Sequence, residues 1–198
     1  MTNVAQHALR FLFDPACPWA WRAALWIRVT ARLRPLSITW ELLSLTELNR
    51  ERLDAAGLER AQRRQPALRL LQAAGMQHGN AALDRLYAAL GQAVHAARCS
   101  LEQRATLADA LRAAELPEAL LAACDDTTLD QRIVARARQA MAEGAFGVPT
   151  LYLADQSAPF FGPVLDPAPT GEVAGQLWDH LVALASTPGF YELKRARS

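Results

Sequence analysis

No stretch of this 198-residue sequence approaches the about 20 uninterrupted apolar residues that a membrane-spanning helix needs. The start of the chain, from Met1 to Arg10, lacks the apolar middle of a secretory signal. We therefore expect a cytoplasmic protein without a membrane partner.

The sequence also has little net charge. Its 21 Lys+Arg and 20 Asp+Glu leave a formal charge of +1 at pH 7, whereas nucleic-acid binding needs a clustered basic surface. The one local excess of arginine, at Arg60, Arg63, Arg64 and Arg69, falls among alanines and leucines in a helical pattern, which is typical of a solvated helix face. The charge pattern predicts no nucleic-acid partner.

Cysteine is scarce. The three cysteines, Cys17, Cys99 and Cys124, are far apart and irregularly spaced. Such spacing matches neither a disulfide framework nor a set of metal ligands. We therefore expect no metal site and no permanently bound cofactor. The composition, 52% hydrophobic and 21% charged, is typical of a globular chain long enough to bury a core.

One of these cysteines stands where an apolar run, Leu9 to Phe13, gives way to a predicted helix. Pro18 suits the first helical position, so Cys17 becomes the helix cap. The amides and the positive dipole end of a helix lower a cysteine pKa from about 8.5 to roughly 3.5–7.5. We expect a nucleophilic thiolate; the alternative is a buried, inert cysteine.

The fourth position of this segment, Ala20, is as informative as the cysteine. Cys-x-x-Cys at a strand-to-helix junction is typical of thioredoxin-like redox proteins, and here the second cysteine is missing. A mixed disulfide on Cys17 must then be cleared by an external thiol, unless the sulfur does chemistry that never ends in an internal disulfide.

The beginning of the chain predicts a strand–helix–strand unit. A strand over Leu9 to Phe13 is followed by a helix from Trp19 to Leu33, which stops before Pro35. The alternating segment Ser37 to Leu43 is rich in β-formers. We expect these two strands to be parallel, with a right-handed crossover.

The next ~85 residues have alanine, leucine and arginine at helical periods and predict an all-helical insertion. We expect breaks at Gly57, Pro66, Gly75-Met76, Gly79, Gly91 and Pro117.

The end of the chain returns to strands. A helix from Asp130 to Glu143, closed by Gly144, precedes β-like segments at 149–153 and 158–161, joined by a turn at Asp155-Gln156-Ser157. A last helix spans Gly171 to Ala185.

The order of these elements predicts an α/β protein with a thioredoxin fold and an inserted all-helical domain. We expect residues 1–45 and 129–198 to form a discontinuous thioredoxin-like domain and residues 46–128 to form the helical insertion domain.

The chain resembles the DsbA-like branch of the thioredoxin superfamily and, within it, the mycothiol-dependent nitroreductase and thiol-reductase family. The similarity covers both ends of the chain well and the helical insertion loosely. It rests on these segments: Phe13-Asp14-Pro15, Cys17-Pro18-Trp19, Leu43-Ser44-Leu45 through Asn49, Gly147-Val148-Pro149-Thr150, Phe160 to Leu165, Gly175 to Asp179 and Glu192 to Arg195.

This resemblance implies that Val148-Pro149 is a cis peptide facing Cys17, and that the backbone of Val148 can pair with a bound thiol compound or peptide. It also implies mycothiol, or a similar small thiol, as a co-substrate. Relatives usually carry the second cysteine where this chain has Ala20, which puts the usual dithiol cycle in question.

Other candidate site residues each have a second interpretation. His95 either acts as an acid or base near the thiol or is structural. Trp19 and Trp21 either stack on an aromatic substrate or pack. Asn49 either binds a ligand or caps a helix, and Asp14 either tunes the thiol or caps.

Three functions follow from these residues. The first is a monothiol enzyme in which Cys17 attacks a small substrate and a mycothiol-type thiol resolves the mixed disulfide. The second is a redox-neutral cis–trans isomerase of a conjugated polyene or enoyl compound, for which a carrier-bound acyl group is a candidate partner. The third is a binding module without catalysis. For the two enzymes we expect a small, hydrophobic or aromatic substrate.

Overall fold

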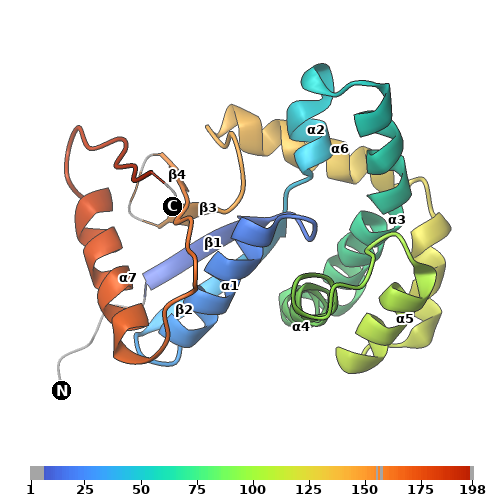
Figure 1. Ribbon diagram of the computed structural model, residues 1–198, viewed down its shortest axis with the longest axis horizontal. Helices are drawn as coiled ribbons and strands as arrows, with labels where there is room; N and C mark the ends of the chain where they lie inside the picture. The colour runs from blue at the N-terminus through green and yellow to red at the C-terminus, as the bar shows by residue number, and fades with distance from the viewer. Residues whose placement is uncertain (1–6, 155, 157, 197–198) are drawn as a thin grey trace.

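The computed structural model describes residues 7–154, 156 and 158–196. Its centre is a four-stranded sheet with the strand order β2-β1-β3-β4 (Figure 1). The strands are β1 (His7–Phe13), β2 (Leu36–Leu42), β3 (Thr150–Leu153) and β4 (Phe160–Phe161). β1 pairs with β2 in parallel and with β3 in antiparallel, and β4 is antiparallel to β3. Each predicted strand is found, but the last covers only Phe160–Phe161 of the predicted 158–161. Of the predicted turn between the last two strands, Asp155 and Ser157 lie outside the described residues.

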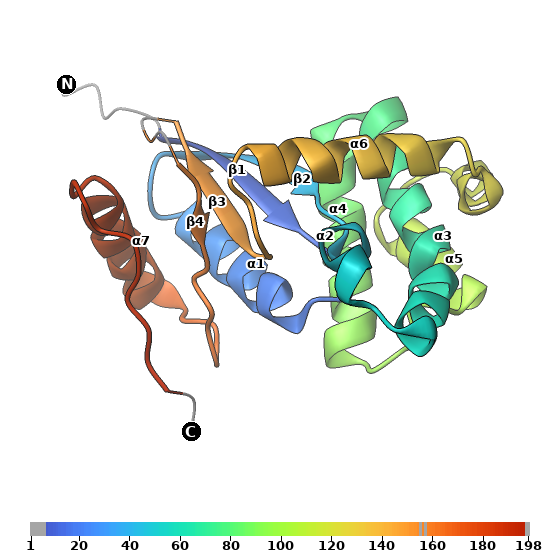
Figure 2. The same cartoon turned by 90° about the horizontal axis from the view of Figure 1, so that it is seen from above.

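The first two strands flank α1 (Pro18–Thr30), as the sequence predicts. This helix ends at Thr30 rather than Leu33. The indole Nε1 of Trp26 donates to the carbonyl of Ala174, at 2.9 Å, and so fixes α1 against α7 (Gly171–Ala185). α6 (Leu129–Ala142) lies on the other side of the strands from α1 (Figure 2).

The middle of the chain is helical and lies at one end of the sheet (Figure 2). No helix in the described ranges is both long and apolar enough to span a bilayer. The helical middle of the chain consists of α2 (Leu45–Asn49), the 3₁₀ turn η1 (Arg50–Arg52), α3 (Ala55–His78), α4 (Asn80–Gly91), the π-helical turn η2 (Gln92–Ala96), α5 (Arg104–Ala113) and the 3₁₀ segment η3 (Glu118–Asp125).

Three predicted breaks in this region are wrong, because α3 runs through Gly57, Pro66 and Gly75. A proline inside a helix removes one backbone hydrogen bond, but tertiary packing of a helix face can outweigh that loss. Seven residues of α3, most of them beyond the proline, are buried. The helix ends at Gly79, whose φ of 81° favours glycine.

Side chains of α4 attach this helical region to the sheet and to α1. The amide of Asn80 pairs with both backbone groups of Trp40, at 2.9 Å and 2.7 Å, and so caps part of the open edge of β2. At the other end of α4, a Cβ on Gly91 would lie 2.1 Å from the Trp21 ring. A glycine is therefore required where α1 and α4 meet.

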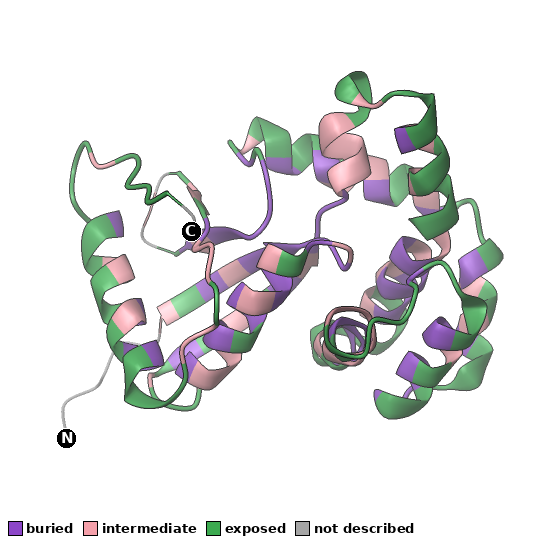
Figure 3. Ribbon diagram, viewed as in Figure 1, coloured by how far each residue is buried: buried purple, intermediate pink, exposed green. Residues whose placement is uncertain are grey.

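The core is continuous from the sheet into the helical region. Buried positions follow the strands and the inward-facing sides of the helices (Figure 3). Phe13, at the end of β1, stacks on Tyr87 of α4, with ring centroids 3.7 Å apart and planes 17° apart. The last residue of β1 is therefore packed against the helical region, four residues before Cys17.

Candidate active site

Cys17 caps the N-terminus of α1, as predicted. Its backbone is extended, with φ −86° and ψ 113°, and its Sγ accepts a hydrogen bond from the Ala20 amide at 3.4 Å. The thiol donates to the Val148 carbonyl, with 3.6 Å between sulfur and oxygen. Cys17 therefore lies between the start of α1 and the segment before β3.

The predicted lowering of the Cys17 pKa is wrong in this structure. Only 6% of Cys17 is exposed. Burial raises the pKa of the thiol above its ordinary value, hydrogen bonds from the amides of Ala20 and Trp19 lower it in part, and the nearby Asp14 carboxylate raises it further. The thiol is therefore protonated at neutral pH in this conformation.

Asp14 holds the loop between β1 and α1. One of its carboxylate oxygens accepts from the Ala16 amide and the other from the Leu45 amide, each at 2.8 Å. The residue is buried, which raises its pKa, while these two bonds lower it. Asp14 thus joins the start of α2 to the loop that ends at Cys17.

The peptide between Val148 and Pro149 is cis, and both residues are buried. The Val148 carbonyl, predicted to pair with a ligand, is engaged by the Cys17 thiol here. On the other side of this segment, the Gly162 amide donates to the Pro149 carbonyl at 2.8 Å. The end of β4 is thereby fixed beside Pro149.

The structure brings His95, in η2, to the loop before the thiol. Its Nε2 lies 2.9 Å from the Pro15 carbonyl. A carbonyl only accepts, so Nε2 carries a proton and donates. Burial lowers the His95 pKa, so the ring is neutral at pH 7 and Nδ1 is its basic nitrogen. The His95 ring also stacks on Trp21, 6.2 Å between centroids.

The two tryptophans differ in their surroundings. Trp21 is buried and packs against Gly91, Tyr87 and His95, so its ring is part of the core rather than open to a ligand. Trp19 is half-buried, and the Arg22 guanidinium lies 5.0 Å from its ring centroid.

The remaining predicted site residues have local roles. The Ala20 side chain is fully buried, and its amide bonds to Cys17. Pro18 is exposed at the first position of α1. The Asn49 amide donates to the Leu45 carbonyl within α2, at 2.8 Å.

The sequence interpretation missed Tyr87 and Arg28. Tyr87 is fully buried, and its hydroxyl has no hydrogen-bond partner in the described part of the chain. The Arg28 guanidinium lies 4.3 Å from the Trp40 ring centroid and 5.3 Å from that of Tyr87. Tyr87 falls in an apolar helical stripe, so its sequence context signals a core residue and nothing more.

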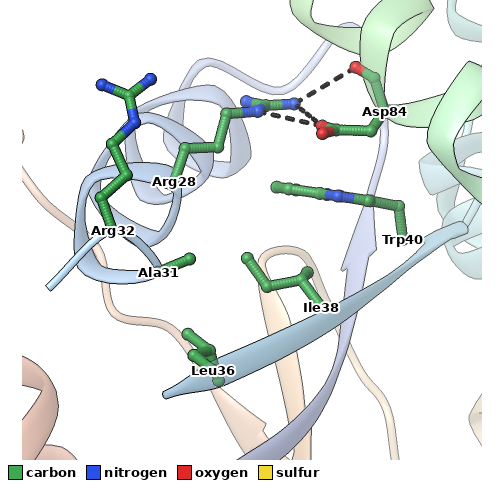
Figure 4. A pocket seen from close by; sticks show the side chains of 7 residues that line it. All are labelled: Arg28, Ala31, Arg32, Leu36, Ile38, Trp40 and Asp84. Atoms are coloured by element: carbon green, nitrogen blue, oxygen red, sulfur yellow. Dashed lines mark hydrogen bonds and ion pairs between the residues drawn. The ribbon is translucent and has the colours of Figure 1, made fainter. Parts of the chain in front are cut away.

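A surface pocket of about 340 Å³ lies between the end of α1, β2 and α4. Arg28 bonds Asp84 there and covers the Trp40 indole (Figure 4). Cys17 does not line this pocket, so it is separate from the thiol.

Nothing in the described ranges groups three or more His, Cys, Asp or Glu side chains as a metal site. Of the other cysteines, Cys99 is exposed and Cys124 is buried. The arginines of α3 are partly paired: Arg63 with Glu59 and Glu102, and Arg69 with Asp130.

Solved structures confirm the predicted DsbA-like thioredoxin fold. One is the "probable DsbA oxidoreductase SCO1869 from Streptomyces coelicolor", with a TM-score of 0.62 and 19% identity over 97% of this chain and 95% of that one. Another is a "2-hydroxychromene-2-carboxylate isomerase", with a TM-score of 0.63 and 15% identity over 89% and 93%. At these identities the likeness shows the fold alone.

Sequence comparison identifies the family. The chain is 34% identical to the "Uncharacterized protein Rv2286c" of Mycobacterium tuberculosis over all of this chain and 84% of that protein. Residues 16–195 match the Rv2466c-like family model, described as mycothiol-dependent nitroreductase Rv2466c. This chain, with its lone thiol at the start of α1, therefore belongs to the Rv2466c-like family of mycothiol-dependent nitroreductases.

Proposed function

We propose that the protein is a monothiol enzyme in which Cys17 is the nucleophile for a mycothiol-type, thiol-dependent reduction or transfer on a small substrate. The observation that carries this proposal is the position of the Cys17 sulfur, at the start of α1 and 3.6 Å from the carbonyl that precedes Pro149. Membership of a mycothiol-dependent family supports thiol-related chemistry at this sulfur.

With a disulfide substrate the cycle has two steps. Cys17 Sγ bonds to one substrate sulfur, the substrate S–S bond breaks, and the other half leaves as a thiol with the proton of Cys17. A free small thiol then attacks the half held on Cys17. The small thiol and that half leave together as a mixed disulfide, and the proton of the small thiol passes to Cys17, which becomes a thiol again. Ala20 supplies no second sulfur, so the small thiol is the resolving group.

The first step needs a base because burial keeps the Cys17 thiol protonated. We assign this role to His95, which is neutral and whose basic Nδ1 is set by the bond from Nε2–H to Pro15. Since Pro15 is two residues before Cys17, the imidazole is held by the same loop as the thiol.

The test is the exchange of a model mixed disulfide with reduced mycothiol. We expect Cys17→Ser to lower the rate to that of the uncatalysed exchange, because a hydroxyl cannot form the mixed disulfide. Cys99→Ser, which removes an exposed thiol, is the matched control and should keep the rate. Unchanged exchange by the Cys17→Ser variant would refute the proposal.

The buried Ala20 beside the thiol also favours a second candidate, a redox-neutral isomerase. Cys17 thiolate would add to a conjugated double bond, the resulting single bond would rotate, and elimination would restore the double bond and the thiolate. The similarity in fold to an isomerase fits this chemistry. Turnover of a conjugated cis-enoyl substrate without any added thiol would favour it over thiol transfer.

A further inference from the structure

Two aromatic side chains are exposed next to the segment that Cys17 faces. Phe146 is 70% exposed and Phe161 is 45% exposed. Their ring centroids are 5.2 Å apart, with planes inclined by 30°. Exposed phenylalanines that touch one another form a contiguous apolar surface, which marks a binding site more often than scattered apolar residues do.

Contacts connect this pair to the thiol. A Cβ on Gly147 would lie 2.6 Å from the Phe161 ring, so that ring rests directly on the Gly147 backbone. The next residue is Val148, whose carbonyl accepts from the Cys17 thiol. The residue after Phe161, Gly162, donates to the Pro149 carbonyl. The aromatic pair therefore lies beside the segment that contains the carbonyl facing the thiol.

The size and chemistry of the patch indicate a small, flat ligand. A stable protein partner needs about 800 Å² on each side, far more than two phenyl rings present. Aromatic rings with centroids 4.5–7 Å apart attract one another beyond simple burial. A flat ring of a ligand that packs against this pair would gain the same kind of contact.

Trp19, the predicted stacking residue nearest the thiol, already has a cation–π contact. The Arg22 guanidinium lies over its ring, and Arg22 also pairs with Asp166 at 2.7 Å. Phe146 and Phe161, in contrast, are exposed beside the segment that faces the thiol.

We propose that Phe146 and Phe161 bind a planar aromatic or conjugated group of the molecule that reacts with Cys17, and so determine which substrates reach the thiol. This inference rests on the proposed role of Cys17. It names the substrate class of that site: an apolar, flat group close to the reacting sulfur or double bond.

The test compares two disulfide reagents that react with Cys17 in the same way. Dipyridyl disulfide carries a flat ring and hydroxyethyl disulfide does not; with each, Cys17 gains one half of the reagent and the other half leaves as a thiol. The rate constants are followed on the Cys17 peptide by mass spectrometry, so that exposed Cys99 does not contribute.

We expect Phe146→Ala, and separately Phe161→Leu, to lower the ratio of the aromatic to the aliphatic rate constant by about 3- to 10-fold relative to the unmodified protein. Phe161→Leu keeps an apolar contact with Gly147, so the β4 end stays packed. Leu184→Ala, which trims an exposed apolar side chain of α7, is the control and should leave the ratio unchanged.

The outcomes distinguish a failure of this inference from a failure of the proposed role of Cys17. If Cys17 reacts with both reagents and neither phenylalanine variant changes the ratio, the aromatic pair does not select the substrate and this inference is wrong. If Cys17 of the unmodified protein reacts with neither reagent, the proposed nucleophile is wrong and this inference is overturned with it.

Discussion

At the Cys17 sulfur, two effects act on the pKa in opposite directions. The start of α1 supplies amide hydrogen bonds to Sγ, which stabilise a thiolate, and the loss of water destabilises it. Burial is the larger effect. The sequence shows the helix cap but not the burial, because the Val148 segment that packs against the sulfur is distant in the chain.

We therefore expect the alkylation of Cys17 by iodoacetamide to rise with pH, with a midpoint above the ordinary thiol pKa of about 8.5. The physical reason is that only the thiolate reacts. The rate is measured on the Cys17 peptide by mass spectrometry, with the exposed Cys99 peptide as the internal control. A midpoint below about pH 7 would mean that the helix amides outweigh burial.

Candidate site residues were predictable only where local sequence decides their role. Cys17 and Pro18 define a helix start, and the structure has that start. Trp21 has the same local signal as Trp19, yet it is buried against Gly91, a contact between α1 and α4 that no local pattern reveals.

Among the elements, those at both ends of the chain follow their local patterns. The helix Gly171–Ala185 has the predicted limits. α3 does not follow its local pattern, because a buried face of a 24-residue helix outweighs its internal proline and glycines. Proline and glycine alone therefore do not predict where a long helix ends when tertiary packing stabilises that helix.

The contact between α1 and α4 gives a test at this scale. We expect Gly91→Ala to lower the free energy of unfolding by about 1–3 kcal/mol, because the new Cβ would lie 2.1 Å from the Trp21 ring and force the core to shift. Chemical denaturation measures the change.

Gly75→Ala is the matched control for that substitution. Gly75 also lies in a helix, but its Cβ would meet Leu83 at an ordinary 3.5 Å. This variant should be neutral or more stable by up to about 1 kcal/mol, since alanine favours a helix over glycine. Equal effects at the two positions would contradict the close packing of Trp21 on α4.

Across the whole molecule, an ion pair joins the helical region to α6. Arg69 of α3 holds both carboxylate oxygens of Asp130, at 2.7 Å and 2.6 Å, and its third nitrogen donates to the Cys124 carbonyl. The Arg69 hydrogen bonds lower the Asp130 pKa. The discontinuous domain division remains a prediction, and α6 packs on α3 across it.

We expect Asp130→Asn to lower the free energy of unfolding at pH 7 by about 1–3 kcal/mol, through weaker bonds to a charged partner. The folded pKa is lowered, so this contribution is present above the ordinary carboxyl pKa of about 3.9 and is lost as pH falls through the folded value. The difference between the two proteins should therefore shrink below about pH 4, as followed by urea denaturation across pH.

Asp109→Asn, which breaks an exposed pair with Arg112 in α5, is the control and should change stability by no more than about 1 kcal/mol. A constant difference for Asp130→Asn down to pH 2 would show that ionisation of Asp130 does not contribute.

The central claim, that Cys17 is the reactive thiol of this molecule, is tested most directly by the mass of the protein after incubation with oxidised mycothiol. We predict one added mycothiol, located on the Cys17 peptide and removed by reduced mycothiol. A Cys17 peptide that stays unmodified while Cys99 is labelled would contradict the account.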